Sequence, residues 1–218
     1  MKIEIISDDR VSSGKNLSRV AWELSRSPDD TTPLDTILSI DAPVNEIPSV
    51  VMSVQCTILE REIFASFRDH VMWARTSRVD APSEFVVPEY FQVSEERDKI
   101  ILLKEKIKAD MDAGVIQDEY RLHMPISAMT SFTTRLSWRG LVKIYKLYQQ
   151  LAKINEYFIV GKTELNNKFQ LHKYAGNYSY VDPIPMLKEN ERKSGVIGPI
   201  VTVCQEMTIG LRAQVVRH

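Results

Sequence analysis

Glycine is scarce in this chain, and this limits the folds and sites that it can form. Only eight of the 218 residues are glycine, about half of the usual share. Gly161-Lys162-Thr163 ends like a P-loop, but Glu156 stands where the first glycine of that loop would be. No G-x-G-x-x-G segment occurs either. The sequence therefore argues against a Walker phosphate loop and against a Rossmann dinucleotide site.

The charge and cysteine content are typical of a cytoplasmic globular protein. The net charge is −1, from 28 basic and 29 acidic residues, which excludes a polybasic nucleic-acid or membrane-surface protein. The two cysteines, Cys56 and Cys204, form no C-x-x-C pair, as expected in a reducing compartment. No apolar run approaches the roughly 18 residues of a membrane span, and the N-terminus lacks a signal-peptide core. We expect a cytoplasmic protein with no nucleic-acid or membrane partner.

The pattern of apolar residues predicts one domain with both strands and helices. Alternation and β-branched residues predict strands over 2–6, 50–58 and 132–137. Helical periodicity and capping residues predict helices over 17–26, 60–72, 94–112 and 138–158, the last being the longest. Residues 31–48 carry several prolines and are predicted to be a loop. The fold class predicted over residues 1–218 is therefore a single α/β (α+β) domain.

The residue patterns of common enzymes are absent from the sequence. The four histidines show no metal-ligand spacing, and no G-x-S-x-G elbow occurs. Arginines do stand beside hydroxyl groups, most clearly in Arg75-Thr76-Ser77-Arg78. An irregular loop of this kind can bind a phosphate through N–H groups, hydroxyls and a guanidinium. The same arginines can instead form surface ion pairs, which contribute only about 0–1 kcal/mol each.

Residues 46–88 resemble the flavin-dependent thymidylate synthases. The family has an H-E-T-P-like turn, a strand, a helix that ends in R-H-R, an S-x-R motif and an F-Y-I-P-like stretch. In the same order this chain has Asn45-Glu46-Ile47-Pro48, Phe67-Arg68-Asp69-His70, Thr76-Ser77-Arg78 and Phe85-Val86-Val87-Pro88.

Residues 113–156 continue the resemblance. The family shows an S-G-V segment, an E-x-A-R-x-x-L-P segment, T-x-F and an N-x-R-S-L helix start. The corresponding segments here are Ala113-Gly114-Val115, Glu119 to Pro125, Thr130-Ser131-Phe132 and Ser137-Trp138-Arg139-Gly140-Leu141. Together the two segments span nearly half of the chain at near-family spacing.

The resemblance implies a fold, a reaction and a set of site residues. The fold is a mixed, twisted sheet flanked by helices, and the active sites lie between the subunits of a homotetramer. The reaction is methylation of dUMP at C5, with 5,10-methylenetetrahydrofolate as carbon donor and FAD reduced by NADPH. The matching positions for the nucleotide phosphate are Thr76, Ser77, Arg78 and Arg121. Those for the cofactor environment are Arg68, His70, Ser137 and Arg139.

The chain also departs from the family pattern, mainly at groups that hold the flavin and the uracil ring. Arg68-Asp69-His70 replaces R-H-R, and the Asn-Glu pair that follows in the family is missing. Tyr148 stands at the position of a base-contacting arginine, and a phenol reads a pyrimidine edge differently from a guanidinium. We therefore expect a substrate or product other than dUMP and its methylated form: UMP, a cytosine nucleotide, or hydroxymethylation at C5.

Two alternatives remain beside a divergent pyrimidine-nucleotide methyltransferase. A degenerate homologue that binds a nucleotide or a partner without catalysis would explain the lost flavin-facing groups. An unrelated α/β protein would use its arginines only in surface ion pairs.

Overall fold

The computed structural model describes residues 1–10, 17–26, 31–67, 70–74, 94–116, 119, 124 and 127–179. All of them lie in one compact unit, Met1–Val181. Residues 182–218 lie outside the described part, so a single domain over the whole chain stays a prediction. Within the described part, no helix is both long enough and apolar enough to cross a membrane.

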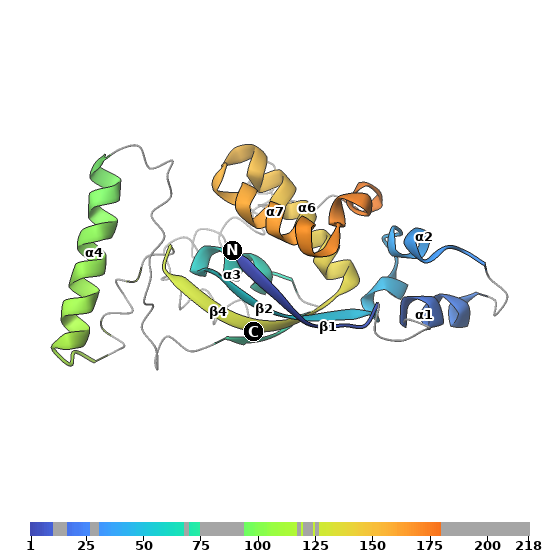
Figure 1. Cartoon of the computed structure of the whole chain (residues 1–218), viewed down its shortest axis with the longest axis horizontal. Coiled ribbons are helices and arrows are strands. Elements are labelled where there is room, and N and C mark those ends of the chain that lie inside the picture. Colours follow the sequence, from blue (N-terminus) through green and yellow to red (C-terminus); the bar gives the residue numbers. More distant parts are fainter. Residues whose placement is uncertain are drawn as a thin grey trace, which may run out of the picture. The chain divides into compact units, whose positions relative to one another are not determined.

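Four strands form the sheet, in the order β1-β2-β4-β3 (Figure 1). They are β1 (Lys2–Asp8), β2 (Ser49–Thr57), β3 (His70–Ala74) and β4 (Met129–Ser137). All three pairings between these strands are antiparallel. This confirms the α+β class and the three strands expected near 2–6, 50–58 and 132–137, while β3 was not expected.

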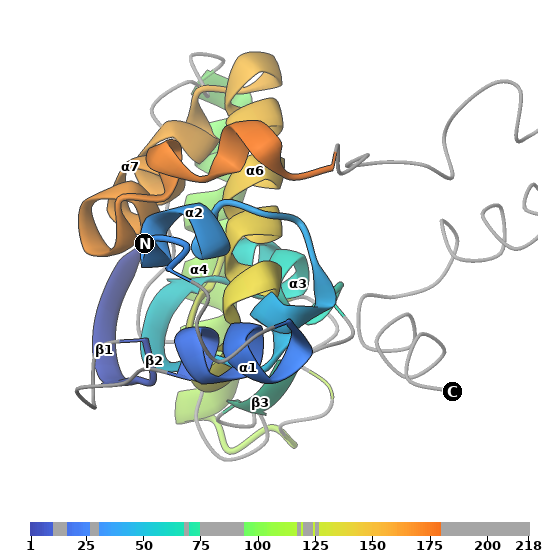
Figure 2. The same cartoon turned by 90° about the vertical axis from the view of Figure 1, so that its right-hand side faces the viewer.

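The helices follow in the same chain order. They are α1 (Leu17–Ser25), α2 (Leu34–Leu38), α3 (Ile58–Ala65), α4 (Ser94–Asp112), α6 (Trp138–Ile154) and α7 (Tyr157–Phe169). Short 3-10 helices lie at Pro43–Glu46, Leu171–Lys173 and Ala175–Asn177. Figures 1 and 2 show α6 and α7 packed together on one side of the sheet.

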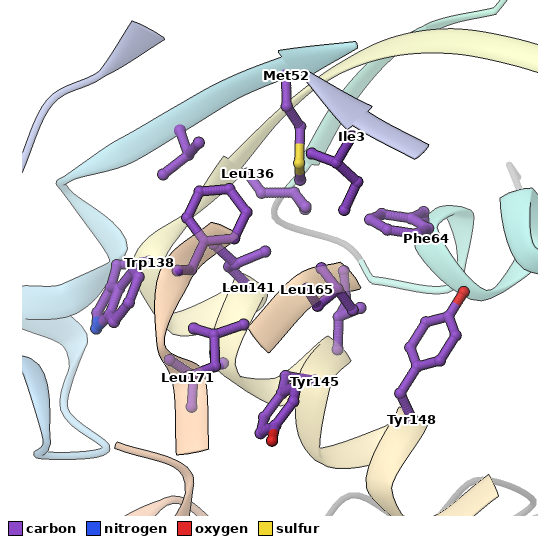
Figure 3. Packing of buried hydrophobic residues seen from close by; sticks show 14 of the residues in the cluster. Ile3, Met52, Phe64, Leu136, Trp138, Leu141, Tyr145, Tyr148, Leu165 and Leu171 are labelled. Carbon is purple, nitrogen blue, oxygen red and sulfur yellow. The ribbon is translucent and has the colours of Figure 1, made fainter. Parts of the chain in front are cut away.

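The core lies between the sheet and these two helices (Figure 3). On β2, Val50, Met52 and Val54 are fully buried, whereas the alternate residues Val51 and Ser53 are only partly buried. Strand alternation thus places one row of side chains against the helices. The helices contribute Leu141, Ile144, Tyr145, Tyr148 and Leu165. Each fully buried aliphatic side chain contributes about 1.5–3 kcal/mol to folding.

Two predicted helices differ from those in the structure. The helix expected over 60–72 ends at Ala65, and His70–Ala74 forms β3 instead. The helix expected over 138–158 is divided at Asn155, whose backbone is extended and whose Oδ1 accepts a hydrogen bond from the N–H of Tyr157 at 2.9 Å. That hydrogen bond starts α7, which continues to Phe169.

Two further comparisons concern α4 and the proline-rich segment. The helix expected over 94–112 is confirmed as α4, now the longest described helix, and Gly114 follows it with a positive φ of 72°. That is the conformation expected of a glycine after a helix C-terminus. The predicted loop over 31–48 contains α2 and the 3-10 helix Pro43–Glu46.

Candidate functional site

The candidate site lies where β4 ends and α6 begins. Ser137 is the last residue of the strand and the N-cap of the helix. Its hydroxyl accepts a hydrogen bond from the N–H of Gly140 at 2.9 Å, satisfying one of the backbone donors that a helix start leaves without a partner. Ser49, at the start of β2, pairs with Ser137 across the sheet. The sequence therefore turns from strand to helix beside the start of a neighbouring strand.

Arg139 projects from the first turn of α6 onto two carboxylates. Its Nε donates to Asp41 Oδ1 at 2.6 Å, and its Nη1 donates to Glu46 Oε1. Both acceptors lie within residues 31–48, the segment that the sequence predicts to be a loop. Hydrogen bonds to Asp41 and Glu46 raise the pKa of Arg139. Arg139 is therefore a fully charged group with two protein acceptors.

Asp41 is the centre of this ionic cluster. Its Oδ2 accepts hydrogen bonds from the N–H of Ser179, at 2.9 Å, and from the Ser179 hydroxyl. Lys143 Nζ lies 3.7 Å from Oδ1. Burial acts to raise the pKa of Asp41, but the hydrogen bonds from Ser179 and Arg139 and the charge of Lys143 hold it well below its usual range. The carboxylate is therefore ionised at neutral pH.

The structure brings some of the predicted site residues together and separates another. His70 begins β3 and pairs with Leu136 of β4, the residue before Ser137, so its backbone lies beside the end of that strand. Tyr148 lies ten residues further along α6, about 15 Å from the start of that helix. The other predicted site residues, Arg68, Thr76, Ser77, Arg78 and Arg121, lie outside the described residues.

Tyr148 is a core residue in this structure. Its side chain is 0% exposed, and its ring packs near those of Phe64 and Phe158. Its hydroxyl lies 3.8 Å from Met1 Sδ, and burial raises the pKa of the phenol well above its usual value. A base contact would require an accessible hydroxyl, so this arrangement removes the support for the predicted contact.

A second polar group, which the sequence analysis did not single out, is buried at the start of α3. Glu60 is almost fully buried, and its Oε2 accepts from the N–H of Thr57 at 3.2 Å and from the hydroxyl of Tyr157 at 3.3 Å. The Tyr157 hydroxyl also lies 2.6 Å from Thr57 Oγ1. Thr57 and Glu60 form a capping box, and the T-x-x-E spacing is the sequence signal for it. These groups stabilise the helix start and are closed to a ligand.

Two of the described positions that the resemblance assigns to the cofactor environment, Ser137 and Arg139, already have protein partners. The Ser137 hydroxyl caps α6, and Arg139 directs two guanidinium nitrogens at Asp41 and Glu46. An anionic group would reach Nη1 by displacing Glu46, whose side chain is 48% exposed, and would reach Nε by displacing Asp41. The described part of the chain also contains no cluster of three potential metal ligands.

The partners of Arg139 could be found from the sequence only in part. Glu46 belongs to the N-E-I-P segment quoted for the resemblance, but a role opposite Arg139 is visible only in the structure. Asp41 and Ser179 lie 98 and 40 residues away from Arg139 in the sequence and carry no local signal.

Cys56 is buried, and burial raises the pKa of its thiol, in line with a cysteine that has no chemical role.

The described unit thus combines an antiparallel sheet, two helices that cover one of its faces, and a strand-to-helix junction at the candidate site. These features define an α+β structural class. Solved structures place the chain in that class: its fold is similar to that of the flavin-dependent thymidylate synthases. Thymidylate synthase X (ThyX) from Helicobacter pylori, solved with FAD and dUMP, superposes with a TM-score of 0.62 at 13% identity. The match covers 80% of this chain and 96% of that one.

A second similar structure has a related activity. The UMP/dUMP methylase PolB from Streptomyces cacaoi, bound to 5-Br dUMP, matches with a TM-score of 0.54 at 14% identity. That match covers 67% of this chain and 77% of the PolB chain. No family model matches the sequence, and no curated protein matches it. At these identities the likeness shows the fold alone.

Proposed function

We propose that this protein is a divergent flavin-dependent methyltransferase that modifies C5 of a pyrimidine nucleoside monophosphate such as dUMP or UMP. The carbon donor would be 5,10-methylenetetrahydrofolate, with FAD as cofactor and NADPH as reductant. The observation that carries the proposal is the fold likeness to ThyX, which extends over 96% of that chain. The sequence motifs of the resemblance also support the proposal, because they follow the family's order and spacing.

In this proposal the protein positions the nucleotide and supplies charge. Thr76, Ser77, Arg78 and Arg121 would hold the 5′-phosphate through charge-assisted hydrogen bonds, each worth about 1.5–3 kcal/mol. Arg68 and His70 would lie near the cofactor. The chain would act in the cytoplasm as a homotetramer whose subunits complete each site.

A second function is favoured by the ionic cluster at Arg139. Ser137 and Arg139, two of the described positions where the family resemblance implies a flavin environment, already have protein partners. A homologue that binds a nucleotide without catalysis would need neither group free. The argument from Tyr148 for a cytosine nucleotide, for UMP or for hydroxymethylation at C5 loses its support, because it rested on Tyr148 reading the base, and Tyr148 is buried.

The first experiment is the visible absorption spectrum of the purified protein before and after addition of FAD. A bound-flavin spectrum, with methyl transfer to dUMP or UMP, is the expected result. A colourless protein that does not retain FAD but binds UMP would leave the non-catalytic alternative.

The phosphate contacts are tested separately. Arg78→Ala should weaken nucleotide binding more than tenfold in calorimetry while leaving the unfolding transition unchanged, because one charge-assisted contact is lost. An unchanged affinity would remove Arg78 from the phosphate site.

A further inference from the structure

The two carboxylate partners of Arg139 are held very differently. Asp41 accepts from the N–H and the hydroxyl of Ser179 as well as from Arg139, lies 3.7 Å from Lys143 Nζ, and has a side chain that is 9% exposed. Glu46 accepts from Arg139 Nη1, and its side chain is 48% exposed. Within the described part of the chain, Glu46 has no second hydrogen-bond or ion-pair partner. Asp41 is therefore fixed, whereas one contact holds Glu46.

The backbone on both sides of Glu46 is anchored. Asn45 is buried, and its Nδ2 donates to two carbonyl oxygens of the preceding segment, at 2.7 and 2.8 Å. Two residues after Glu46, the carbonyl of Pro48 accepts from the N–H of Trp138, the first residue of α6, at 2.8 Å. The Glu46 carboxylate can therefore leave Arg139 by rotation of its own side chain, without a rearrangement of the backbone.

The guanidinium can offer more to a ligand than it gives to Glu46. Its Nε donates to Asp41 and its Nη1 to Glu46, and among the described residues Nη2 has no acceptor. Once Glu46 swings out, Nη1 and Nη2 present two parallel N–H donors, which match two oxygens of a phosphate group. Lys143 lies one turn further along the same face of α6 and adds a second positive charge.

The charges of the cluster also favour exchange over coexistence. Arg139 and Lys143 carry two positive charges, and Asp41 and Glu46 carry two negative ones. An anion that replaces Glu46 keeps this balance. An anion that binds beside Glu46 would bring like charges together, which costs free energy. A ligand anion and Glu46 therefore compete for the same guanidinium.

We propose that Glu46 is a built-in competitor at Arg139: its carboxylate occupies the guanidinium in the ligand-free protein and must swing out before a phosphate group binds. Exposed ion pairs favour their closed form by up to about fivefold. Removing the carboxylate should then raise the affinity for the anion by up to about sixfold, because the whole population becomes competent to bind. The identity of the ligand that carries the phosphate rests on the proposed function, whereas the competition rests on the contacts of Arg139.

The test is calorimetry of the full-length protein with inorganic pyrophosphate, an anion that lacks base, sugar and flavin. Glu46→Gln should bind it about two- to sixfold more tightly than the unmodified protein, with the unfolding transition little changed, because the side chain is half exposed. Glu156→Gln is the matched control. It removes an exposed carboxylate that makes no capping hydrogen bond, beyond the far end of α6, and its pyrophosphate affinity should equal that of the unmodified protein.

Further variants assign the gain to Arg139. Arg139→Gln should weaken pyrophosphate binding about tenfold or more, since charge-assisted hydrogen bonds are lost, and adding Glu46→Gln to it should bring no further gain. Glu46→Asp keeps the negative charge on a side chain shorter by one methylene. Its affinity should lie between those of the unmodified protein and Glu46→Gln, because the shorter carboxylate occupies Arg139 less well.

The outcomes separate this competition from the proposed methyl transfer. Equal pyrophosphate affinities of Glu46→Gln and the unmodified protein overturn it, even where the protein binds FAD and methylates dUMP. Binding that survives Arg139→Gln, or that Glu46→Gln lacks altogether, also overturns it, because the anion then does not bind at Arg139. Tighter binding in Glu46→Gln that depends on Arg139 supports it, even where no flavin binds and methyl transfer fails.

Discussion

At the scale of single residues, Gly161 on α7 is required by its neighbours. A Cβ at this position would collide with Cε1 of Tyr148 and would lie 3.0 Å from Oε1 of Glu60. The Tyr148 ring is itself enclosed by Phe64 and Phe158 and has little room to move. The glycine therefore sets the distance between α7 and α6.

Gly161→Ala should destabilise the protein by about 1–3 kcal/mol, the usual cost of overpacking a core. Gly176→Ala is the control, because a Cβ there meets nothing within 4 Å. Urea unfolding measures both free energies. Equal stability of the two variants would contradict the close packing of α6 on α7.

Asp41 should make the stability of the protein depend on pH. Its pKa in the folded state lies below the unfolded value of about 3.9, so the folded state binds fewer protons when the pH is near that value. The stabilisation by Asp41 is then fully present above about pH 4 and is lost as the pH falls toward the folded-state pKa.

Asp41→Asn should therefore be less stable than the unmodified protein at pH 7, and the difference should shrink at pH 3. Urea unfolding at the two pH values measures it. Asp112→Asn, at an exposed position on α4, controls for the loss of one carboxylate. A difference for Asp41→Asn that is equal at both pH values would argue against the ionic cluster around Arg139.

At the scale of elements, two strand-to-helix junctions have the same construction. β2 ends at Thr57, which caps α3, and β4 ends at Ser137, which caps α6. Since β2 and β4 are antiparallel neighbours, the two helices begin at opposite ends of the strand pair. In both junctions a hydroxyl side chain ends the strand and satisfies a backbone donor of the helix.

Ser137→Ala should cost about 0.5–2 kcal/mol of stability through the lost cap, whether or not a ligand is present. Ser137→Thr should restore most of it, because threonine also caps helices. Thermal unfolding of the two variants tests this. An unchanged melting temperature in Ser137→Ala would show that the cap contributes little, and a ligand contact would then be the better role for this serine.

At the scale of the whole molecule, the resemblance predicts a homotetramer. Light scattering coupled to size exclusion should give four times the mass of one chain. The mass of a single chain would contradict the homotetramer that the resemblance implies.

Much of this fold could be predicted from the sequence, because its signals are local. Alternation along 50–58 and 132–137 reflects a strand with one buried face, and the apolar stripe from Leu141 to Tyr148 reflects a helix against it. Capping by Ser137 and the glycine after α4 also depend on only a few neighbouring residues.

Other features depend on partners distant in the sequence. Residues 70–74 have an apolar pattern that fits a helix or a strand, and hydrogen bonding to β4, some 60 residues later, makes them a strand. The two carboxylate partners of Arg139 and the burial of Tyr148 likewise arise from packing between distant segments. The sequence by itself determined the main strands, the helix starts and the resemblance to a family. Only the tertiary structure decided which charges are paired and which side chains are buried, because long-range contacts set the environment of a side chain.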